Sequence, residues 1–555
     1  MKIRFSGEAL LSNPQLNKGT AFSERERRDF ALSGKLPPRI ESIEMQTARV
    51  LAQLQKRIGA LEKNLFLNEL YAVNRTLFFK VVDLNLEELL PIIYTPTIGD
   101  AVMEYSLNFV NPQGLIIGPD DLDRIDEIFA AYDPDELDIA VVTDGEGVLG
   151  IGDQGIGGLN IAIGKLMVYT ACAGINPFKT LPIQLDVGTN NRTLLEDPLY
   201  LGLRKERMSG QPYYEFIERF VTAFKKRFKK SFLHWEDFGK DNARKVLDLY
   251  RTAHPSFNDD IQGTGAIALA AVLTGIRKSG VPSDRHRFCI FGAGTAGVGI
   301  ADQICQGLAE LENSSIEEVR RRFYLIDRHG LIRQGQDRTL DFQKPYIRTY
   351  EDMQGWVCTG PQECTLSDTL RHAGITVLIG CSTASGAFNA EVLQQMHKNT
   401  PHPIILPLSN PTSKAEATPV QIIEATNGKA FIATGSPFDP VEYDGRTFKI
   451  SQCNNALVYP GIALGMLISS ASQLTERMLF AASMAVSENC NTDAKNTELL
   501  PALQHVKKLS AKVAVAVAMQ AAAEGLAEKT SEDSLHEKIA EKTWQPEYAE
   551  YFRAD

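Results

Sequence analysis

The spacing of apolar residues changes along this chain of 555 residues. In the first hundred residues, apolar side chains recur every three or four positions, as at Ile43, Val50 and Leu54, and this spacing predicts amphipathic helices. The alanine-rich tail from Pro501 also predicts a helix. We expect its apolar stretch, 513–519, to be buried inside the protein or against a partner subunit.

From about residue 138, short apolar runs that end in polar or glycine-rich turns alternate with helical stretches. The runs predict strands at 138–143, 181–186, 287–291, 323–327, 376–380 and 403–408. Such alternation is typical of parallel α/β sheets. We therefore predict an α/β protein made of a helical N-terminal region (1–110), an α/β catalytic domain (111–262), a doubly wound Rossmann-type dinucleotide-binding domain (263–450) and a helical C-terminal segment (451–555).

The composition is that of an ordinary globular protein, with 44% hydrophobic and 23% charged residues. No apolar run reaches the ~20 residues needed to cross a bilayer and no signal core follows the start, so we expect no membrane or export route. The net charge of -11 argues against nucleic-acid binding. The basic run 225–230 follows a helical pattern and predicts a solvated helix end.

The eight cysteines show neither a C-x-x-C pair nor a repeated spacing. This pattern predicts neither a zinc site nor a disulfide framework, and a reducing cytoplasm fits it.

A glycine-rich turn containing Gly292, Gly294 and Gly297 follows an apolar strand and precedes a helical stretch. In dinucleotide-binding folds, the first such glycine permits a tight turn, the second lets the pyrophosphate approach the backbone, and the third lets helix and strand pack closely. The N–H groups at the helix start suit a phosphate. The turn therefore predicts a dinucleotide site.

Asp327 ends the next predicted strand, where a carboxylate accepts hydrogen bonds from a ribose diol and repels a 2'-phosphate. NAD is therefore expected rather than NADP. Asp327 lies further from the glycines than the usual ~20 residues, which requires an elongated connection. Arg328 and Arg333 could pair with a phosphate, so NADP stays open as the alternative.

Acidic residues follow two apolar segments: Glu236 and Asp237 after the first, and Asp259 and Asp260 in the second. Clustered carboxylates repel one another unless a cation lies among them, and oxygen ligands suit Mg2+ or Mn2+. The alternative is that these acids are helix caps or surface pairs, since Asp260 precedes a predicted helix.

Lys165 lies in an apolar, helix-like stretch, and Tyr94 is followed by a turn. Desolvation lowers the pKa of a lysine and makes it a general base near neutral pH, whereas a lysine that extends to solvent keeps its charge. Tyr94 could place its hydroxyl at a cleft mouth or simply pack in the core.

At these residues the sequence closely resembles the malic enzyme family, which includes the malolactic enzymes, over nearly its whole length. The matching segments are 17–22, 94–97, 143–146, 150–153, 185–190, 236–238, 257–264, 408–412 and 454–455.

The resemblance implies that Tyr94 is the general acid, that Lys165 is the general base and that Asp259 tunes Lys165. It implies that Asn410 and Asn455 bind the substrate. The implied metal ligands are Glu236, Asp237 and Asp260, and the implied cofactor-binding residues are Gly292, Gly294, Thr295, Ala296, Gly297, Asp327 and Asn410. Members are typically dimers or tetramers, and their C-terminal segment returns to the substrate domain.

The implied reaction is the NAD-dependent, Mg2+- or Mn2+-dependent oxidative decarboxylation of malate to pyruvate and CO2. One departure from the family pattern is Gly147, which stands where malic enzymes usually carry an arginine. Malolactic enzymes resemble the chain at Gly147 and at 234–239. The alternative is therefore conversion of malate to lactate and CO2 with NAD retained in the site.

Overall fold

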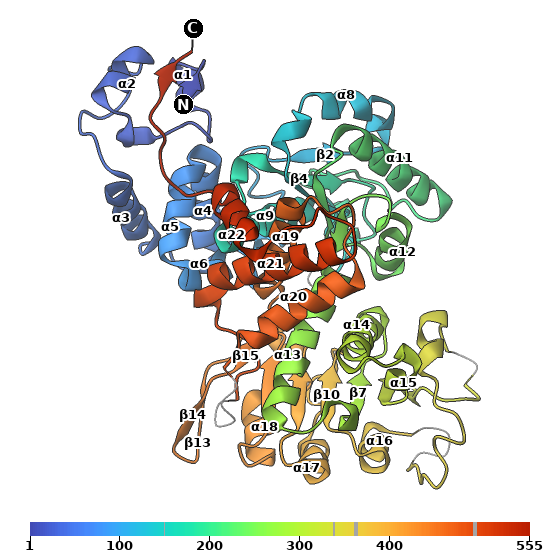
Figure 1. Ribbon diagram of the computed structural model, residues 1–555. Helices are drawn as coiled ribbons and strands as arrows, with labels where there is room; N and C mark the ends of the chain where they lie inside the picture. Colours follow the sequence, from blue (N-terminus) through green and yellow to red (C-terminus); the bar gives the residue numbers. More distant parts are fainter. Residues whose placement is uncertain (149, 337–338, 360–363, 492–496, 555) are drawn as a thin grey trace. The chain divides into compact units, whose positions relative to one another are not determined.

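The computed structural model describes residues 1–148, 150–336, 339–359, 364–491 and 497–554. It contains two compact units, Met1–Gly239 with Glu537–Asp555, and Lys240–His536 (Figure 1). These units are divided differently from the predicted domains, whose boundaries stay a prediction. The helical N-terminal region belongs to the same unit as the catalytic sheet, the second unit starts at residue 240 rather than 263, and only 537–555 of the predicted C-terminal segment belong to the first unit.

The first unit is built on parallel strands in the order β2 (Leu115–Ile117), β4 (Thr180–Leu185), β3 (Ile139–Thr143) and β5 (Phe232–Trp235). All five residues of β3 are buried, which explains its continuous apolar run. Helix α9 (Leu159–Ala173) packs against β3 and β4. Because the strands are parallel, their carboxyl ends lie along one edge, and the acidic residues that follow β3, β4 and β5 gather there.

The N-terminal region is helical, as predicted. Its helices are α1 (Gly7–Leu11), α2 (Glu24–Asp29), α3 (Ile43–Leu54), α4 (Ala60–Val73), α5 (Arg75–Leu84), α6 (Leu86–Ile93) and α7 (Ile98–Met103), and α8 (Ile125–Ala130) follows this region. Further along are α10 (Arg192–Glu196) and α11 (Gln211–Arg227), whose basic last turn is the predicted solvated helix end. The chain's end returns to this unit, where β16 (Phe552–Arg553) pairs with β1 (Lys2–Ile3) and Lys542 Nζ lies 2.7 Å from Asp138 Oδ1.

The second unit contains a sheet in the order β15 (Ser451–Gln452), β12 (Phe431–Thr434), β11 (Ile404–Pro407), β10 (Val377–Gly380), β7 (Phe288–Phe291), β8 (Phe323–Asp327) and β9 (Gly330–Leu331). Only β9 is antiparallel to its neighbour. Without the edge strands β9 and β15, the order is that of a doubly wound 2-1-3-4-5 sheet, whose direction of winding reverses between β7 and β10. Ligands bind such sheets at this reversal, outside the carboxyl ends of the strands.

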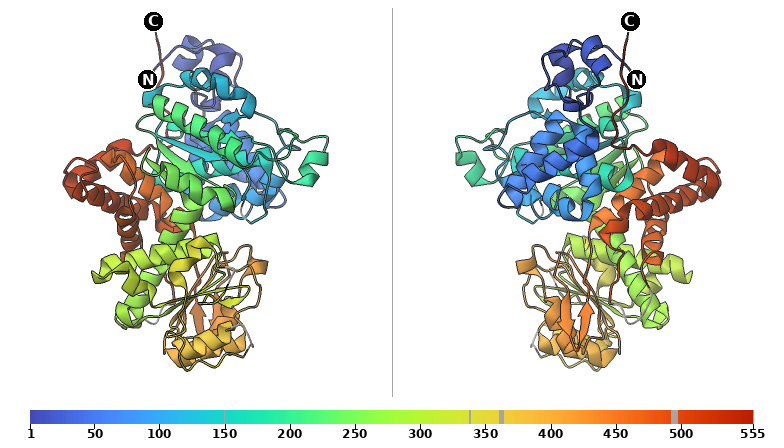
Figure 2. Two further views of the ribbon diagram at one scale, coloured as in Figure 1. Left: turned by 90° about the vertical axis from the view of Figure 1, so that its right-hand side faces the viewer. Right: turned by 90° about the vertical axis from the view of Figure 1, so that its left-hand side faces the viewer.

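Helices cover both faces of this sheet. Helices α16 (Leu366–Ala373), α17 (Ala390–Asn399) and α18 (Pro419–Ala425) pack on one face, as Figure 2 shows in yellow and orange. Helices α13 (Thr264–Ser279) and α14 (Thr295–Glu312) pack on the other, where a β-carbon on Gly275 of α13 would lie 2.6 Å from the Ile404 side chain. The fold is therefore the predicted Rossmann-type architecture.

The C-terminal helices α19 (Tyr459–Ser469), α20 (Glu476–Glu488) and α21 (Val506–Ala523) pack on one another and, through α20, on α13. Val513, Val517 and Ala518 are fully buried there, as predicted, whereas Met519 at the end of the predicted stretch is 40% exposed. This apolar packing keeps the segment in the second unit. The remaining elements are α12 (Lys240–Tyr250), β6 (Ser256–Asn258), α15 (Ile316–Arg320), the hairpin of β13 (Val441–Tyr443) and β14 (Arg446–Phe448), and α22 (Glu532–Lys542).

The segment Gly155–Ala173 is long and apolar enough to cross a membrane by composition, but 94% of it is buried inside the protein. It includes α9, which therefore has the character of a core helix.

Cys358 and Cys364 form a disulfide across a Cα separation of 4.9 Å. The sequence predicted no disulfide framework, and it did not indicate this single pair. A single spacing of six residues carries no recognisable signal, and the fold alone brings the two Cα atoms within the range that a disulfide spans.

Candidate active site

The first unit brings three predicted site residues together at the edge of its sheet. Lys165 Nζ on α9 lies 3.1 Å from Glu236 Oε1, directly after β5. The hydroxyl of Tyr94, which follows α6, lies 3.4 Å from the same oxygen. The amine of Lys165 is also 5.2 Å from the centre of the Tyr94 ring. An amine, a phenol and a carboxylate therefore share one buried position, although they lie far apart in the sequence.

Lys165 does not extend to solvent, which excludes the alternative weighed from its sequence. Only 3% of the residue is exposed, because α9 is buried on nearly every side. Burial favours the neutral amine, while the Glu236 carboxylate favours the ammonium. Tyr94 is buried as well, with its hydroxyl directed toward Glu236 rather than into an apolar core.

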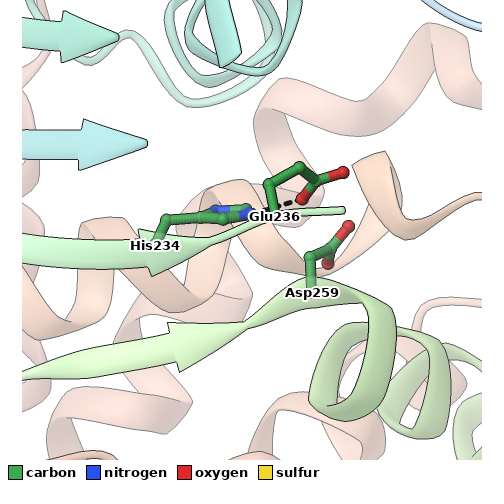
Figure 3. Close-up of side chains that lie close together, drawn as sticks. All are labelled: His234, Glu236 and Asp259. Carbon is green, nitrogen blue, oxygen red and sulfur yellow. Dashed lines mark hydrogen bonds and ion pairs between the residues drawn. The ribbon is translucent and has the colours of Figure 1, made fainter. Parts of the chain in front are cut away.

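The two acids after β5 are held in different ways. Glu236 Oε2 lies 2.6 Å from Nε2 of His234, two residues earlier on β5 (Figure 3). Asp237 has a left-handed backbone with φ of 54°, a conformation that costs energy in a residue other than glycine. Such strain is concentrated at functional sites, and two buried carboxylates in sequence supply the hard oxygen donors that Mg2+ and Mn2+ prefer.

The loop after β3 packs tightly against the loop after β5. The Gly147 N–H donates a hydrogen bond of 2.9 Å to the Asp237 carbonyl. A β-carbon at Gly147 would lie 2.7 Å from the Phe238 carbonyl oxygen, closer than real β-carbons approach. An arginine therefore cannot occupy position 147 unless one of the two loops moves. The departure from the family pattern falls where the two loop backbones lie in close contact.

Arg207 holds the loop after β3 through hydrogen bonds. Its guanidinium donates to both carboxylate oxygens of Asp153, at 2.6 and 3.0 Å, and to the Asp144 carbonyl at 3.0 Å. Tyr213 donates to Asp144 Oδ2 at 2.6 Å. Complete burial raises the pKa of Asp144 to about 6, although Arg207 and Tyr213 partly oppose the rise.

In the second unit, Asp259 and Asp260 begin a short π-helix, Asp259–Gly263, directly after β6. Figure 3 includes Asp259 at this position. The helix is capped by Asn258, whose side chain accepts from the Ile261 N–H at 3.0 Å, so Asp260 is not the cap that the sequence allowed. Asn455 donates to Asp259 Oδ2 at 3.0 Å, which brings two predicted site residues together.

The glycine-rich turn lies at the winding reversal of the second sheet and has the predicted glycine functions. Gly292 has φ of 106°, and a β-carbon on it would lie 2.6 Å from the Cys381 backbone after β10. A β-carbon on Gly297 would collide with the Gly292 carbonyl, whereas one on Gly294 would meet open space. Thr295 and Ala296 form the first turn of α14. The turn therefore fits a dinucleotide pyrophosphate at the start of α14.

Asp327 ends β8, as predicted, and its Oδ1 accepts from the His329 N–H at 2.6 Å. The long connection from the glycines is filled by the 18 residues of α14 and by the additional helix α15. Asn410 follows β11, and its Oδ1 accepts a hydrogen bond of 2.5 Å from the Ser436 hydroxyl. The sequence did not indicate this partner, nor the contacts of His234 with Glu236 and of Tyr169 with His234, because only the fold brings these residues together.

A dinucleotide-binding α/β unit and a second α/β unit with a buried acid–base cluster together define a dinucleotide-dependent enzyme. The NAD-binding domain of malic enzyme matches residues 261–522, and the malic enzyme N-terminal domain matches residues 71–251. The chain belongs to the malic enzyme family.

Named relatives agree with this assignment over the whole chain. The chain is 45% identical over 553 residues to the NAD-dependent malic enzyme of Pseudomonas syringae pv. syringae, covering 99% of this chain and 98% of that one. It is 46% identical over 514 residues to NAD-dependent malic enzyme 3 of Bacillus subtilis, covering 92% and 91%. The crystal structure of Entamoeba histolytica malic enzyme shares the fold, with a TM-score of 0.55 at 22% identity, covering 92% and 91%.

The close approach at Gly147 predicts that even one methyl group there is costly. In Gly147→Ala, the new β-carbon must push the Phe238 carbonyl away, and overpacking of this kind costs about 1–3 kcal/mol. We expect a lower midpoint of thermal unfolding and weaker Mn2+ binding, because Asp237 moves with the loop. Gly152→Ala is the control, since a β-carbon there meets nothing within 4 Å, although its positive φ adds backbone strain. Equal Mn2+ affinities in the two variants would contradict the prediction.

The raised pKa of Asp144 predicts a pH-dependent stability. The folded protein keeps this proton up to about pH 6, whereas the unfolded chain loses it near the ordinary value of 3.8. The protonated Asp144 therefore stabilises the folded protein fully below the ordinary pKa of 3.8, and this stabilisation is lost as the pH rises to about 6. In Asp144→Asn the loss disappears, so its stability relative to the parent should rise by on the order of 3 kcal/mol between pH 4 and 7.

Asp153→Asn is the matched control for Asp144→Asn. Burial opposes the charge of Asp153, but the ion pair with Arg207 outweighs burial and lowers its pKa. Its stabilising effect is present above the ordinary value of 3.8 and is lost below it. Urea unfolding of both variants should therefore show a slope for Asp144→Asn and a flat difference for Asp153→Asn from pH 4 to 7. The same slope in both would contradict the assignment.

Proposed function

We propose that this protein catalyses the oxidative decarboxylation of (S)-malate to pyruvate and CO2 with reduction of NAD. The observation that carries the proposal is the buried contact of Lys165 and Tyr94 with one oxygen of Glu236, because it unites a base, an acid and a metal-type ligand. The relatives from Pseudomonas syringae and Bacillus subtilis are both named NAD-dependent malic enzyme, and this supports oxidation of malate with NAD.

Glu236, Asp237 and Asp260 are the proposed ligands of Mg2+ or Mn2+. Two of them are buried carboxylates at the carboxyl end of β5, and the third follows β6. When bound, such an ion polarises the substrate's C2 oxygen and stabilises negative charge as CO2 leaves. Asn455 and Asn410 supply amide groups for the substrate carboxylates, and Asn455 also orients Asp259.

In the proposed reaction, Lys165 would accept the proton of the C2 hydroxyl, and bound NAD would supply the acceptor for the hydride that leaves C2. Tyr94 later donates its hydroxyl proton to C3 and produces pyruvate. Both groups contact Glu236 Oε1, so both proton transfers take place beside the same carboxylate. Water is excluded because Lys165, Tyr94 and Glu236 are all buried.

NAD is the proposed cofactor, held by the turn from Gly292 to Gly297 and by Asp327. Gly294 leaves space for the pyrophosphate, and the end of β8 places a carboxylate for the ribose diol.

A homodimer or homotetramer is also proposed. Leu107, Val110 and Leu201 are 65%, 70% and 50% exposed. Leu201 lies near the other two, because its backbone N–H donates to the Ser106 hydroxyl at 3.2 Å. A gathering of exposed apolar side chains favours contact with a second copy. Light scattering should show that Leu201→Asp shifts the protein toward a monomer, while Leu249→Asp, exposed in the second unit, does not. A monomeric parent protein would refute the proposal.

The product distinguishes the proposed reaction from its alternative. Purified protein with malate, NAD and Mn2+ should release pyruvate and NADH in equal amounts, measured by chromatography and by absorbance at the NADH band. Lactate without net NADH would refute oxidative decarboxylation. Much faster turnover with NADP than with NAD would refute the cofactor assignment.

Lys165→Met tests the general base with a side chain of similar length. We expect malate oxidation to fall by about 100-fold or more, as removal of a general base does, while NAD binding persists. Lys179→Met is the control, since Lys179 lies outside the buried cluster and its amine donates to the Asp135 carbonyl at 3.5 Å. Oxidation retained in Lys165→Met would remove Lys165 from the mechanism.

A further inference from the structure

Glu236 ends a buried chain of hydrogen bonds that the proposed reaction does not use. Its Oε2 lies 2.6 Å from His234 Nε2, and His234 Nδ1 lies 2.7 Å from the Tyr169 hydroxyl. His234 and Tyr169 are both fully buried, and their rings meet edge to face with centroids 5.7 Å apart. Neither residue has a role in the reaction as described above.

The spacing of residues along α9 and β5 explains why Lys165 contacts Glu236 and Tyr169 contacts His234. Lys165 and Tyr169 are four residues apart on α9, so they share one helix face about 6 Å apart along the axis. His234 and Glu236 are two residues apart at the end of β5, so they share one strand face about 6.6 Å apart. The two spacings nearly match, and Lys165 therefore meets Glu236 where Tyr169 meets His234.

Glu236 and Tyr169 determine which ring nitrogen of His234 carries a proton. A carboxylate accepts only, so the His234 ring must carry a proton on Nε2 to donate to Glu236. In neutral histidine, Nδ1 then accepts, and the Tyr169 hydroxyl donates to it. Tyr169 thus selects the tautomer of His234, and His234 occupies one oxygen of Glu236. The other oxygen, Oε1, is the one that contacts Lys165 and Tyr94.

We propose that His234 and Tyr169 are positioning residues that hold Glu236 by Oε2 and so direct its Oε1 to the metal and the acid–base pair. The inference rests on the proposed function, since it assigns Glu236 as a metal ligand. Hydrogen-bond partners of a ligating side chain fix its orientation, and their loss typically weakens metal binding by about 10–100-fold. His234 supports the ligand here and is not itself a ligand.

The test measures the affinity of the full-length protein, stripped of metal, for MnCl2 alone, from the electron paramagnetic resonance signal of free Mn2+. His234→Leu removes the donor to Glu236 and should raise the dissociation constant by about 10–100-fold. His234→Gln restores an N–H donor without a ring nitrogen and should keep the constant within about 3-fold of the parent. Tyr169→Phe deletes only one hydroxyl and should give an intermediate increase.

Steady-state kinetics separate positioning from a general structural role. In His234→Leu and Tyr169→Phe, the Mn2+ concentration for half-maximal rate should rise with the dissociation constant, while kcat at saturating Mn2+ falls less. Melting curves report folding in parallel. If His234→Leu does not fold, the comparison of His234→Gln with Tyr169→Phe carries the test.

His286→Gln is the matched control, because His286 is a buried histidine of the second unit bonded to Thr376 Oγ1 at 3.1 Å. It should leave Mn2+ affinity unchanged. Parent-like affinity in both His234→Leu and Tyr169→Phe would overturn the positioning role. Loss of affinity in His234→Gln as large as in His234→Leu would overturn it in favour of His234 as a direct ligand. A parent protein that binds no Mn2+ would instead overturn the metal assignment of the proposed function, and this inference with it.

Discussion

The first unit depends on the burial of one carboxylate, that of Glu236. A buried charge is costly unless it is paired and hydrogen-bonded, and Glu236 meets this requirement with Lys165 on one oxygen and His234 on the other. Its partners come from α6, α9 and β5, so the position of this single side chain restricts three elements at once. The chemistry and the stability of the region therefore depend on the same contacts.

Close backbone approaches form the second constraint. At Gly147 the loop after β3 touches the loop after β5, and at Gly292 the turn after β7 touches the backbone after β10. Both approaches lie at the carboxyl ends of parallel strands, where loops from neighbouring strands crowd together. The glycines keep these edges compact, so that the carboxylates in one unit and the glycine-rich turn proposed to bind phosphate in the other lie on closely packed backbone.

Family membership explains the reaction and the domains of this protein, whereas its own geometry explains local features of the site. The family match accounts for the type of reaction and for the two kinds of domain. The absence of the usual arginine is explained locally, because Gly147 lies against the Phe238 carbonyl. The support of Glu236 by His234 and Tyr169 is likewise a property of this structure.

The sequence by itself predicted strands β3, β4, β7, β8, β10 and β11, the glycine-rich turn and Asp327 at the end of its strand, because periodicity and short motifs act over a few residues. The roles of Lys165, Tyr94 and Glu236 came from the family resemblance rather than from spacing. Only the tertiary structure decided that Lys165 is buried rather than extended to solvent, that Asn258 rather than Asp260 caps its helix, and that Cys358 joins Cys364. The unit boundary at residue 240 also came from packing. These outcomes depend on contacts between residues distant in the chain, which no local spacing encodes.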